Sequence, residues 1–170
     1  QMCIRDSTGK TGVDTTGEAS GFVNKEIEYS TLALACYAFG QNFNVTPLSL
    51  INAQAACVNG GYLMKPYVVK SIVNSDGEAV VSNSPTVVRQ VVSEQTSATV
   101  RQILEQVVGD PVDGTGKNAY VAGYRIGGKS GTSEQLNMER RADGDYKKVA
   151  SFAAVLPAND PEILVYVMLD

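Results

Sequence analysis

A short run near residue 130 concentrates the groups that could do chemistry. It starts with a lysine and continues with hydroxyl and glycine residues: Lys129, Ser130, Gly131, Thr132 and Ser133. A cation beside hydroxyl groups can bind and orient an anionic substrate, and a glycine lets a substrate approach the main chain closely. We therefore take this run as the candidate site, and two unrelated classes of protein carry such a string.

The composition restricts how the run could catalyse a reaction. The sequence contains no histidine, which excludes a Ser-His-Asp triad, a Cys-His nucleophile pair and any metal site that needs imidazole. The three cysteines, Cys3, Cys36 and Cys57, are far apart and form no C-x-x-C motif. A catalytic base must therefore be another residue type, and neither a metal nor a cofactor is expected.

Size and charge exclude further classes. The chain has 170 residues, of which 44% are hydrophobic and 19% charged, a balance typical of one globular domain. The formal net charge is −4, and the lysines and arginines do not cluster, so a nucleic-acid partner is not expected. No run approaches 18 consecutive apolar residues, and the sequence thus predicts no membrane span.

The first class with such a string is the nucleotide-binding P-loop proteins. The pattern G-x-x-x-x-G-K-[ST] is matched by Gly123, Gly128, Lys129 and Ser130. A P-loop must lead into a helix whose N-terminus binds the phosphates. Residues 131–148 contain two glycines and many charges, with only Leu136 and Met138 as aliphatic anchors, so this helix is not predicted.

The second class is the active-site serine acyltransferases. In these enzymes a K-[ST]-G strand lies opposite a nucleophilic serine in an S-x-x-K helix, and lysine takes the part that histidine has elsewhere. The absence of histidine agrees with this chemistry. The only S-x-x-K string in the sequence begins at Ser7, and we reject it because Gly9 and Gly12 disfavour the required helix.

Hydrophobic spacing predicts two helices. Thr46 and Pro47 are typical of a helix start, and we expect a helix over residues 47–59. A second helix should begin at Ser93 and end at Gly109. Its buried stripe is predicted to comprise Val100, Ile103, Leu104, Val107 and Val108.

The remaining pattern predicts strands. A β-hairpin is expected over residues 68–73 and 79–81, joined by a turn at 74–77. Residues 120–126 are aromatic and β-branched enough to form a strand that leads into the candidate run. Two further strands are predicted over 149–156 and 163–169, and the nearly continuous hydrophobicity of the last one predicts burial on both faces, between helices.

The chain resembles the C-terminal part of the transpeptidase domain of class B penicillin-binding proteins, over residues 8–170. The resemblance rests on ordered pieces of sequence: Lys10 to Asp14, Gly17 to Ala19, Gly40-Gln41, Val45 to Leu48, Asn59 to Gly61, Lys65-Pro66, Gly114 to Lys117, Gly123 to Arg125, Gly128 to Thr132, Ala150 to Phe152, and Pro157-Ala158. Their order and spacing are more specific than any one piece. Two positions depart from the common pattern: Asn42 replaces a glycine, and the usual Lys-Thr-Gly is Lys-Ser-Gly here.

The resemblance implies an incomplete α/β (α+β) fold, in which helices flank an antiparallel sheet like that of β-lactamases and transpeptidases. The family's S-x-x-K and S-x-N motifs precede the region of Gly17; apart from the rejected string at Ser7, this sequence contains neither. No residue of the chain is therefore expected to be the nucleophile, and the chain alone is expected to be inactive. Residues 1–7 do not resemble the family and are expected to be an artefact.

The resemblance also implies a function. In the family, a serine attacks the penultimate D-alanine of a peptidoglycan stem peptide and passes the acyl group to a neighbouring amine, while β-lactams mimic the donor. Lys129 would assist proton transfer and attract the substrate carboxylate, Ser130 and Thr132 would bind that carboxylate, and the Thr132 N–H would form half of the oxyanion hole. Gly128 and Gly131 would let the donor lie along the strand.

The expected partners are peptidoglycan stem peptides, β-lactams, the remainder of the transpeptidase domain and other cell-wall synthesis proteins. The expected location is the outer face of the bacterial cytoplasmic membrane, through an N-terminal anchor that this chain lacks. A serine β-lactamase or a D,D-carboxypeptidase shares the same strand and remains an alternative within the fold.

Overall fold

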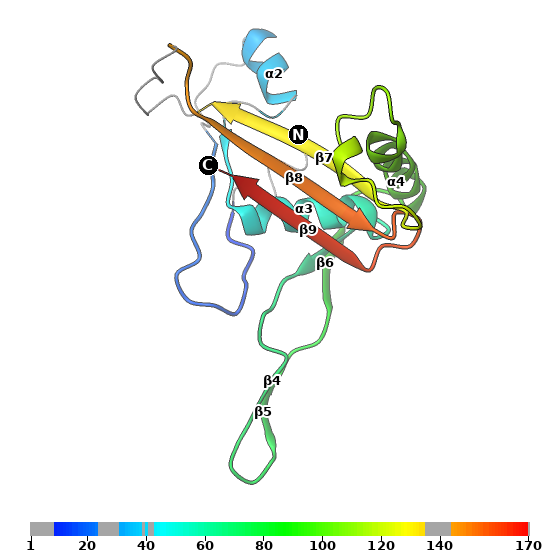
Figure 1. Cartoon of the computed structure of the whole chain (residues 1–170). Helices are drawn as coiled ribbons and strands as arrows, with labels where there is room; N and C mark the ends of the chain where they lie inside the picture. The colour runs from blue at the N-terminus through cyan, green and yellow to red at the C-terminus, as the bar shows by residue number, and fades with distance from the viewer. Residues whose placement is uncertain (1–8, 24–30, 39, 41–42, 135–143, 170) are drawn as a thin grey trace. The chain divides into compact units, whose positions relative to one another are not determined.

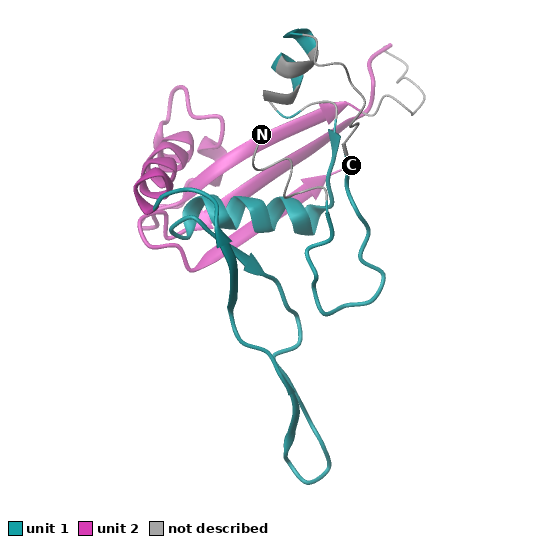
Figure 2. Ribbon diagram, turned by 180° about the vertical axis from the view of Figure 1, so that it is seen from behind, with its two compact units in different colours: residues 1–93 teal, residues 94–170 magenta. Residues whose placement is uncertain are grey.

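The computed structural model describes residues 9–23, 31–38, 40, 43–134 and 144–169. The chain forms two compact units, residues 1–93 and 94–170, which Figure 2 distinguishes by colour. Among the described residues, no helix is long and apolar enough to cross a membrane.

The first unit is organised around one helix. Helix α3 (Pro47–Val58) begins as predicted, because the Thr46 hydroxyl accepts a hydrogen bond of 3.1 Å from Ser49 N–H and proline occupies the first turn. The helix contacts strand β3 (Tyr62–Lys65), which pairs antiparallel with β6 (Thr86–Gln90). This unit also contains β1 (Phe22–Val23), helix α2 (Thr31–Ala38) and β2 (Phe43–Asn44), and β1 pairs with β2.

The predicted hairpin is confirmed, with a shorter first strand. Strands β4 (Ser71–Val73) and β5 (Ala79–Ser82) pair antiparallel and form a narrow two-stranded arm, labelled in Figure 1. The turn is set by Asn74, whose side-chain oxygen accepts hydrogen bonds from two main-chain N–H groups of the turn, and by Gly77 at a φ of 83°. Every residue from 71 to 82 is exposed, so the arm depends on its own pairing and on its base.

The base of this hairpin is held by hydrogen bonds to a carboxylate. Asp14 accepts hydrogen bonds from Val68 N–H (2.8 Å) and Val69 N–H (3.0 Å), and also from Asn83 Nδ2 (3.2 Å). The hydrogen bonds from the main-chain N–H groups, with that from Val68 having the largest effect, lower the pKa of Asp14 below its ordinary value. The segment before the first strand is thereby tied to the chain some fifty residues later.

The second unit is an antiparallel sheet with a helix against it, in agreement with the predicted fold class. Strands β7 (Gly127–Glu134), β8 (Lys148–Leu156) and β9 (Ile163–Leu169) lie in that order, side by side in Figure 1. Helix α4 (Glu94–Gly109) contacts β7, and a short 3-10 helix, η1 (Lys117–Ala119), contacts α4. The predicted ranges for α4, β8 and β9 are confirmed within one residue at each end.

The strand predicted over residues 120–126 is wrong. This segment is a turn and an irregular connection, with a hydrogen bond of 3.1 Å from Tyr124 N–H to the Val121 carbonyl and a φ of 86° at Gly123. The strand starts instead at Gly127 and runs through the candidate site. Strand propensity favours aromatic and β-branched residues, but the positive φ at Gly123 lies outside the range of an extended strand, and the chain turns there.

Two predictions of burial are also wrong. Strand β9 is largely exposed, with values of 53% at Ile163, 50% at Val167 and 67% at Leu169, because among the described residues of this unit it pairs with β8 alone and α4 contacts β7. On α4, Ile103 is 56% exposed, whereas Ser97 is fully buried. The buried line of the helix is therefore narrower than the predicted stripe.

Glycine is required where the second unit is most tightly packed. A Cβ at Gly128 would lie 2.4 Å from Phe152 Cζ and 3.1 Å from Val108 Cγ2, and a Cβ at Gly116 would lie 2.9 Å from the same Phe152 Cζ. The ring of Phe152 is thus enclosed between two glycines that come from different segments. Val155 and Ala158, exposed by only 1% each, complete the core near these residues.

We predict that the base of the hairpin loosens in acid. Because the folded-state pKa of Asp14 is lowered, its stabilisation is complete above the ordinary carboxyl pKa of about 4 and is lost as the pH falls through the lower folded-state value. Hydrogen exchange should show the protection factors of the Val68 and Val69 amides falling over that range. Asp14→Asn should lower the protection factors at neutral pH as well, because an amide carries one oxygen and no charge.

The matched control is Asp76→Asn, which removes the same charge at the tip of the hairpin. This variant should leave the protection of both amides unchanged. Equal loss in the two variants would show that charge alone, and not the Asp14 hydrogen bonds, holds the base.

We predict that Gly128→Ala destabilises the second unit by about 1–3 kcal/mol, the usual cost of overpacking. A Cβ at Gly128 would meet Phe152 Cζ and Val108 Cγ2, and the same Phe152 ring also lies close to Gly116, so a shift of the ring would disturb a second contact. Gly109→Ala is the control, because a Cβ there meets no atom within 4 Å, and its free energy of unfolding should change by less than about 0.5 kcal/mol. Urea unfolding of the chain measures both values, and equal stability of the two variants would contradict the packing argument.

Candidate active site

Strand β7 contains every residue that the sequence predicts for the site. Gly128, Lys129, Ser130, Gly131 and Thr132 follow one another in this strand, opposite residues 150–154 of β8. Successive side chains of a strand alternate between faces, so Ser130 and Thr132 share one face and Lys129 lies on the other. Among the described residues β7 pairs with β8 only, which makes it an edge strand.

The P-loop alternative is excluded by this geometry. In a P-loop the glycine-rich segment is a loop and the lysine and serine open a helix. Here Lys129 and Ser130 lie within an extended strand that continues to Glu134. Residues 135–143, which include the two aliphatic anchors considered above, lie outside the described residues.

The polar groups of β7 are accessible. Lys129 and Thr132 are exposed and Ser130 is half-buried. The Lys129 ammonium group donates a hydrogen bond to the Ser130 carbonyl, which keeps the cation against its own strand. At the far end of the strand Glu134 lies opposite Lys148, an oppositely charged cross-strand pair.

A hydroxyl that the sequence analysis did not assign lies next to Ser130. The Ser130 Oγ donates a hydrogen bond of 3.4 Å to Thr115 Oγ1, from a turn fifteen residues earlier in the chain. The signal in the sequence is a threonine between Gly114 and Gly116. Glycines on both sides of the threonine indicate that the main chain packs closely against another segment. The sequence does not show which segment that is.

The turn that carries Thr115 is fixed by a carboxylate. Asp110 Oδ1 accepts hydrogen bonds from Val112 N–H (2.8 Å) and Asp113 N–H (3.0 Å). These bonds lower the pKa of Asp110, and the bond from Asp113 has the largest effect. The Gly116 N–H donates to the Val107 carbonyl of α4 at 3.0 Å. The turn is therefore hydrogen-bonded directly to the C-terminal end of helix α4.

The start of β7 is held by an ion pair to the same helix. Arg125 donates two hydrogen bonds to the Glu105 carboxylate, at 2.6 Å and 2.7 Å, in a bidentate arrangement. The hydrogen bond from Arg125 lowers the pKa of Glu105, and the same bond raises the pKa of the guanidinium. The Arg125 carbonyl also accepts from Ala158 N–H at 2.8 Å, so the segment is tied to the loop after β8 as well.

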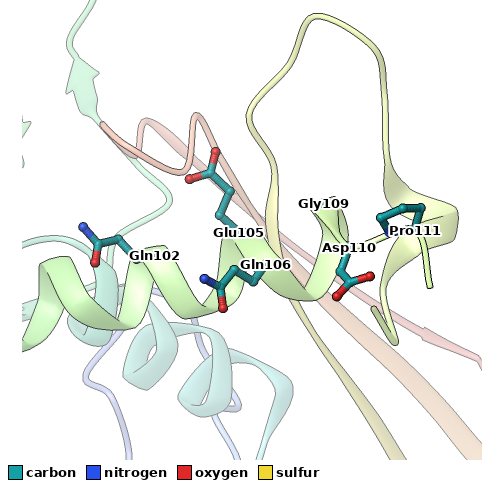
Figure 3. Close-up of a pocket in the computed structure, with 6 residues that line it drawn as sticks. All are labelled: Gln102, Glu105, Gln106, Gly109, Asp110 and Pro111. Atoms are coloured by element: carbon teal, nitrogen blue, oxygen red, sulfur yellow. The ribbon is translucent and has the colours of Figure 1, made fainter. Parts of the chain in front are cut away.

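An open hollow of about 900 Å³ lies along helix α4. Figure 3 shows its lining residues on the helix and the turn that follows it: Gln102, Glu105, Gln106, Gly109, Asp110 and Pro111. None of these is a residue of β7, and the Glu105 carboxylate is already paired with Arg125. The hollow is therefore separate from the candidate site.

The arrangement on β7 suits an extended, anionic ligand. An edge strand offers main-chain donors and acceptors to a ligand that lies alongside it, and small residues permit the close contact. Lys129 provides a positive charge, and the hydroxyls of Ser130 and Thr132 are possible donors for a carboxylate. The described residues of β7 and the adjacent Thr115 turn are thus the candidate binding edge.

Comparisons of the sequence with known proteins point to one protein family. Residues 6–170 match the family described as the penicillin binding protein transpeptidase domain. The chain is 40% identical over 165 residues to stage V sporulation protein D of Bacillus subtilis and 35% identical over 165 residues to the penicillin-binding protein PbpB of Mycobacterium tuberculosis; each match covers 95% of this chain and 24% of the relative. The chain therefore spans about a quarter of the length of these curated relatives.

Solved structures agree with the sequence comparison. The crystal structure of penicillin-binding protein 3 from Mycobacterium tuberculosis, complexed with aztreonam, matches with a TM-score of 0.83 and 33% identity, over 99% of this chain and 39% of that one. The predicted resemblance is thereby confirmed in both sequence and fold. This chain belongs to the family of penicillin-binding protein transpeptidase domains.

Proposed function

We propose that this chain supplies the substrate-binding strand of a peptidoglycan D,D-transpeptidase that cross-links stem peptides by serine acyl transfer. The observation that carries the proposal is β7, an edge strand that presents Lys129, Ser130 and Thr132 without an intervening turn. The nucleophilic serine belongs to the longer protein, at a motif that precedes this part of the domain.

The edge of β7 supports binding of an extended donor peptide. Alternate residues of an edge strand direct their main-chain N–H and C=O groups away from the neighbouring strand. We assign the Ser130 carbonyl, which accepts from Lys129, to the outward set. The period of two then places the Thr132 N–H outward as well, where it would donate to the oxyanion of the tetrahedral intermediate.

The side chains support recognition of the terminal carboxylate. The donor stem peptide ends in a D-alanine carboxylate, and a β-lactam carries a comparable anionic group. Ser130 and Thr132 share one face of β7 and would donate hydrogen bonds to this group, while Lys129 raises the local positive potential and assists proton transfer to the leaving amine. The two glycines that were expected to admit the ligand meet the protein instead: the space at Gly128 is filled by the Phe152 ring, and Gly131 lies against Ser151 Oγ.

The relatives support the same assignment. One solved structure is a complex of penicillin-binding protein 3 with aztreonam and another is a complex with ampicillin, so proteins of this fold bind β-lactams. Several relatives are named peptidoglycan D,D-transpeptidases. We propose that the longer protein acts at the outer face of the bacterial cytoplasmic membrane, among cell-wall synthesis proteins.

Covalent labelling with fluorescent penicillin tests the proposal. The experiment uses the full-length protein that contains this chain. The wild-type protein should form a stable acyl-enzyme, and Lys129→Ala should slow its formation by roughly 100-fold, the typical contribution of a proton-transfer group. Lys70→Ala, at an exposed lysine next to the hairpin strand β4, is the control and should label at the wild-type rate.

Absence of labelling in the wild-type protein would contradict the proposal, and so would normal labelling of the Lys129 variant. Rapid release of the label as hydrolysed penicillin would identify the protein as a serine β-lactamase instead.

A further inference from the structure

We propose that Thr115 is a positioning residue of this site, which orients the Ser130 hydroxyl toward the carboxylate of the bound donor. The inference rests on the proposed function and adds a residue that lies outside the Lys-Ser-Gly strand. It is carried by the hydrogen bond of 3.4 Å between the two hydroxyl groups and by the rigidity of the turn that holds Thr115.

The turn has little freedom to move Thr115 away from β7. A Cβ at Gly114 would lie 2.3 Å from the Asp110 carbonyl oxygen and 2.6 Å from that of Val107, so the main chain lies directly on the end of helix α4. On the other side of Thr115, Gly116 lies against the ring of Phe152. Both glycines are buried while Thr115 itself is exposed. The fold therefore presents this one side chain outward between two anchored neighbours.

Phe152 couples this turn to the strand. Its ring contacts the positions of both Gly116 and Gly128, and it lies opposite Ser130 in the register of β7 and β8. The distance between Thr115 and Ser130 is thus set by packing on a common ring. It does not depend on the hydrogen bond itself.

The donors and acceptors give the pair a direction. Each hydroxyl has one hydrogen to donate and two lone pairs to accept. In the present structure Ser130 donates to Thr115. When a carboxylate binds, Ser130 must donate to that anion, and Thr115 can then reverse the pair by donating its own hydrogen to Ser130 Oγ. Such a chain polarises each bond and strengthens the donor that faces the anion.

The nearby lysine Lys117 does not orient the Ser130 hydroxyl. Lys117 is two residues after Thr115, but its ammonium donates to the Val112 carbonyl at 3.5 Å, within the turn. Its charge also acts on Asp110, where it contributes to the lowered pKa of that carboxyl. Lys117 thus supports the turn, and the polar group that the turn offers to Ser130 is the Thr115 hydroxyl.

The test is the rate of acylation of the full-length protein by benzylpenicillin, in the variants Thr115→Val, Thr115→Ser and Thr115→Ala. The valine variant keeps the shape without the hydroxyl, and we expect its acylation rate to fall roughly fivefold. The serine variant should restore the wild-type rate. The acylation rate of the alanine variant should fall as much as that of the valine variant. This result would show that the loss does not come from the extra methyl group of valine. Thr99→Val, an exposed threonine on α4, is the matched control and should not change the rate.

A double-mutant cycle separates positioning from structure. If Thr115 acts through Ser130, Thr115→Val should cause no further loss in a Ser130→Ala background. A loss that persists in that background would overturn the proposal, because it would show a structural effect independent of Ser130. An unchanged rate in the valine variant would overturn it too, while wild-type labelling would leave the transpeptidase function intact. A wild-type protein that forms no acyl-enzyme would remove the proposed function and this inference together.

Discussion

The ring of Phe152 is the contact on which the geometry of the second unit depends. It lies on the central strand β8 and is enclosed by Gly116 from the turn after α4 and by Gly128 from β7, so tightly that neither position accommodates a methyl group. Aromatic rings pack to high density only against surfaces that fit them, and glycine provides such a surface at two places here. The contact sets how closely the Thr115 turn approaches the strand that carries Ser130.

Charged groups complete this arrangement from the outside. Arg125 and Glu105 join the start of β7 to helix α4, and Asp110 closes the turn at the end of the same helix. Helix α4 is therefore a common base for both parts of the site. Each of these carboxylates has a lowered pKa because its hydrogen bonds favour the ionised form. In the structure these carboxylates hold the start of β7 and the turn that carries Thr115 to the helix.

The sequence predicted some features well because they follow from local chemistry. Thr46 and Pro47 define the start of α3 by capping alone, and the turn at Asn74 to Gly77 defines the hairpin. The Lys-Ser-Gly run marked the candidate site because it places a cation, hydroxyl groups and a glycine next to one another. Its roles in binding and catalysis remain predictions, while its place in one strand is now described.

Other features could not be predicted because they depend on contacts between distant segments. Residues 120–126 have the composition of a strand, yet β7 begins at Gly127, where a glycine can fit against Leu104 and Val155. The exposure of β9 depends on which elements cover the sheet, which the apolar pattern of one strand cannot show. Thr115 was visible only as a threonine between glycines, since nothing local indicates that Ser130 lies beside it.

The central claim is that the edge of β7 holds the ligand by its carboxylate and its carbonyl oxygen. A crystal structure of the full-length protein acylated by ampicillin tests it most directly. The account predicts the ligand carboxylate within about 2.7–3.2 Å of the Ser130 and Thr132 hydroxyls, and the acyl carbonyl oxygen at a similar distance from the Thr132 N–H. An acyl-enzyme whose carboxylate and carbonyl oxygen both lie away from β7 would contradict it.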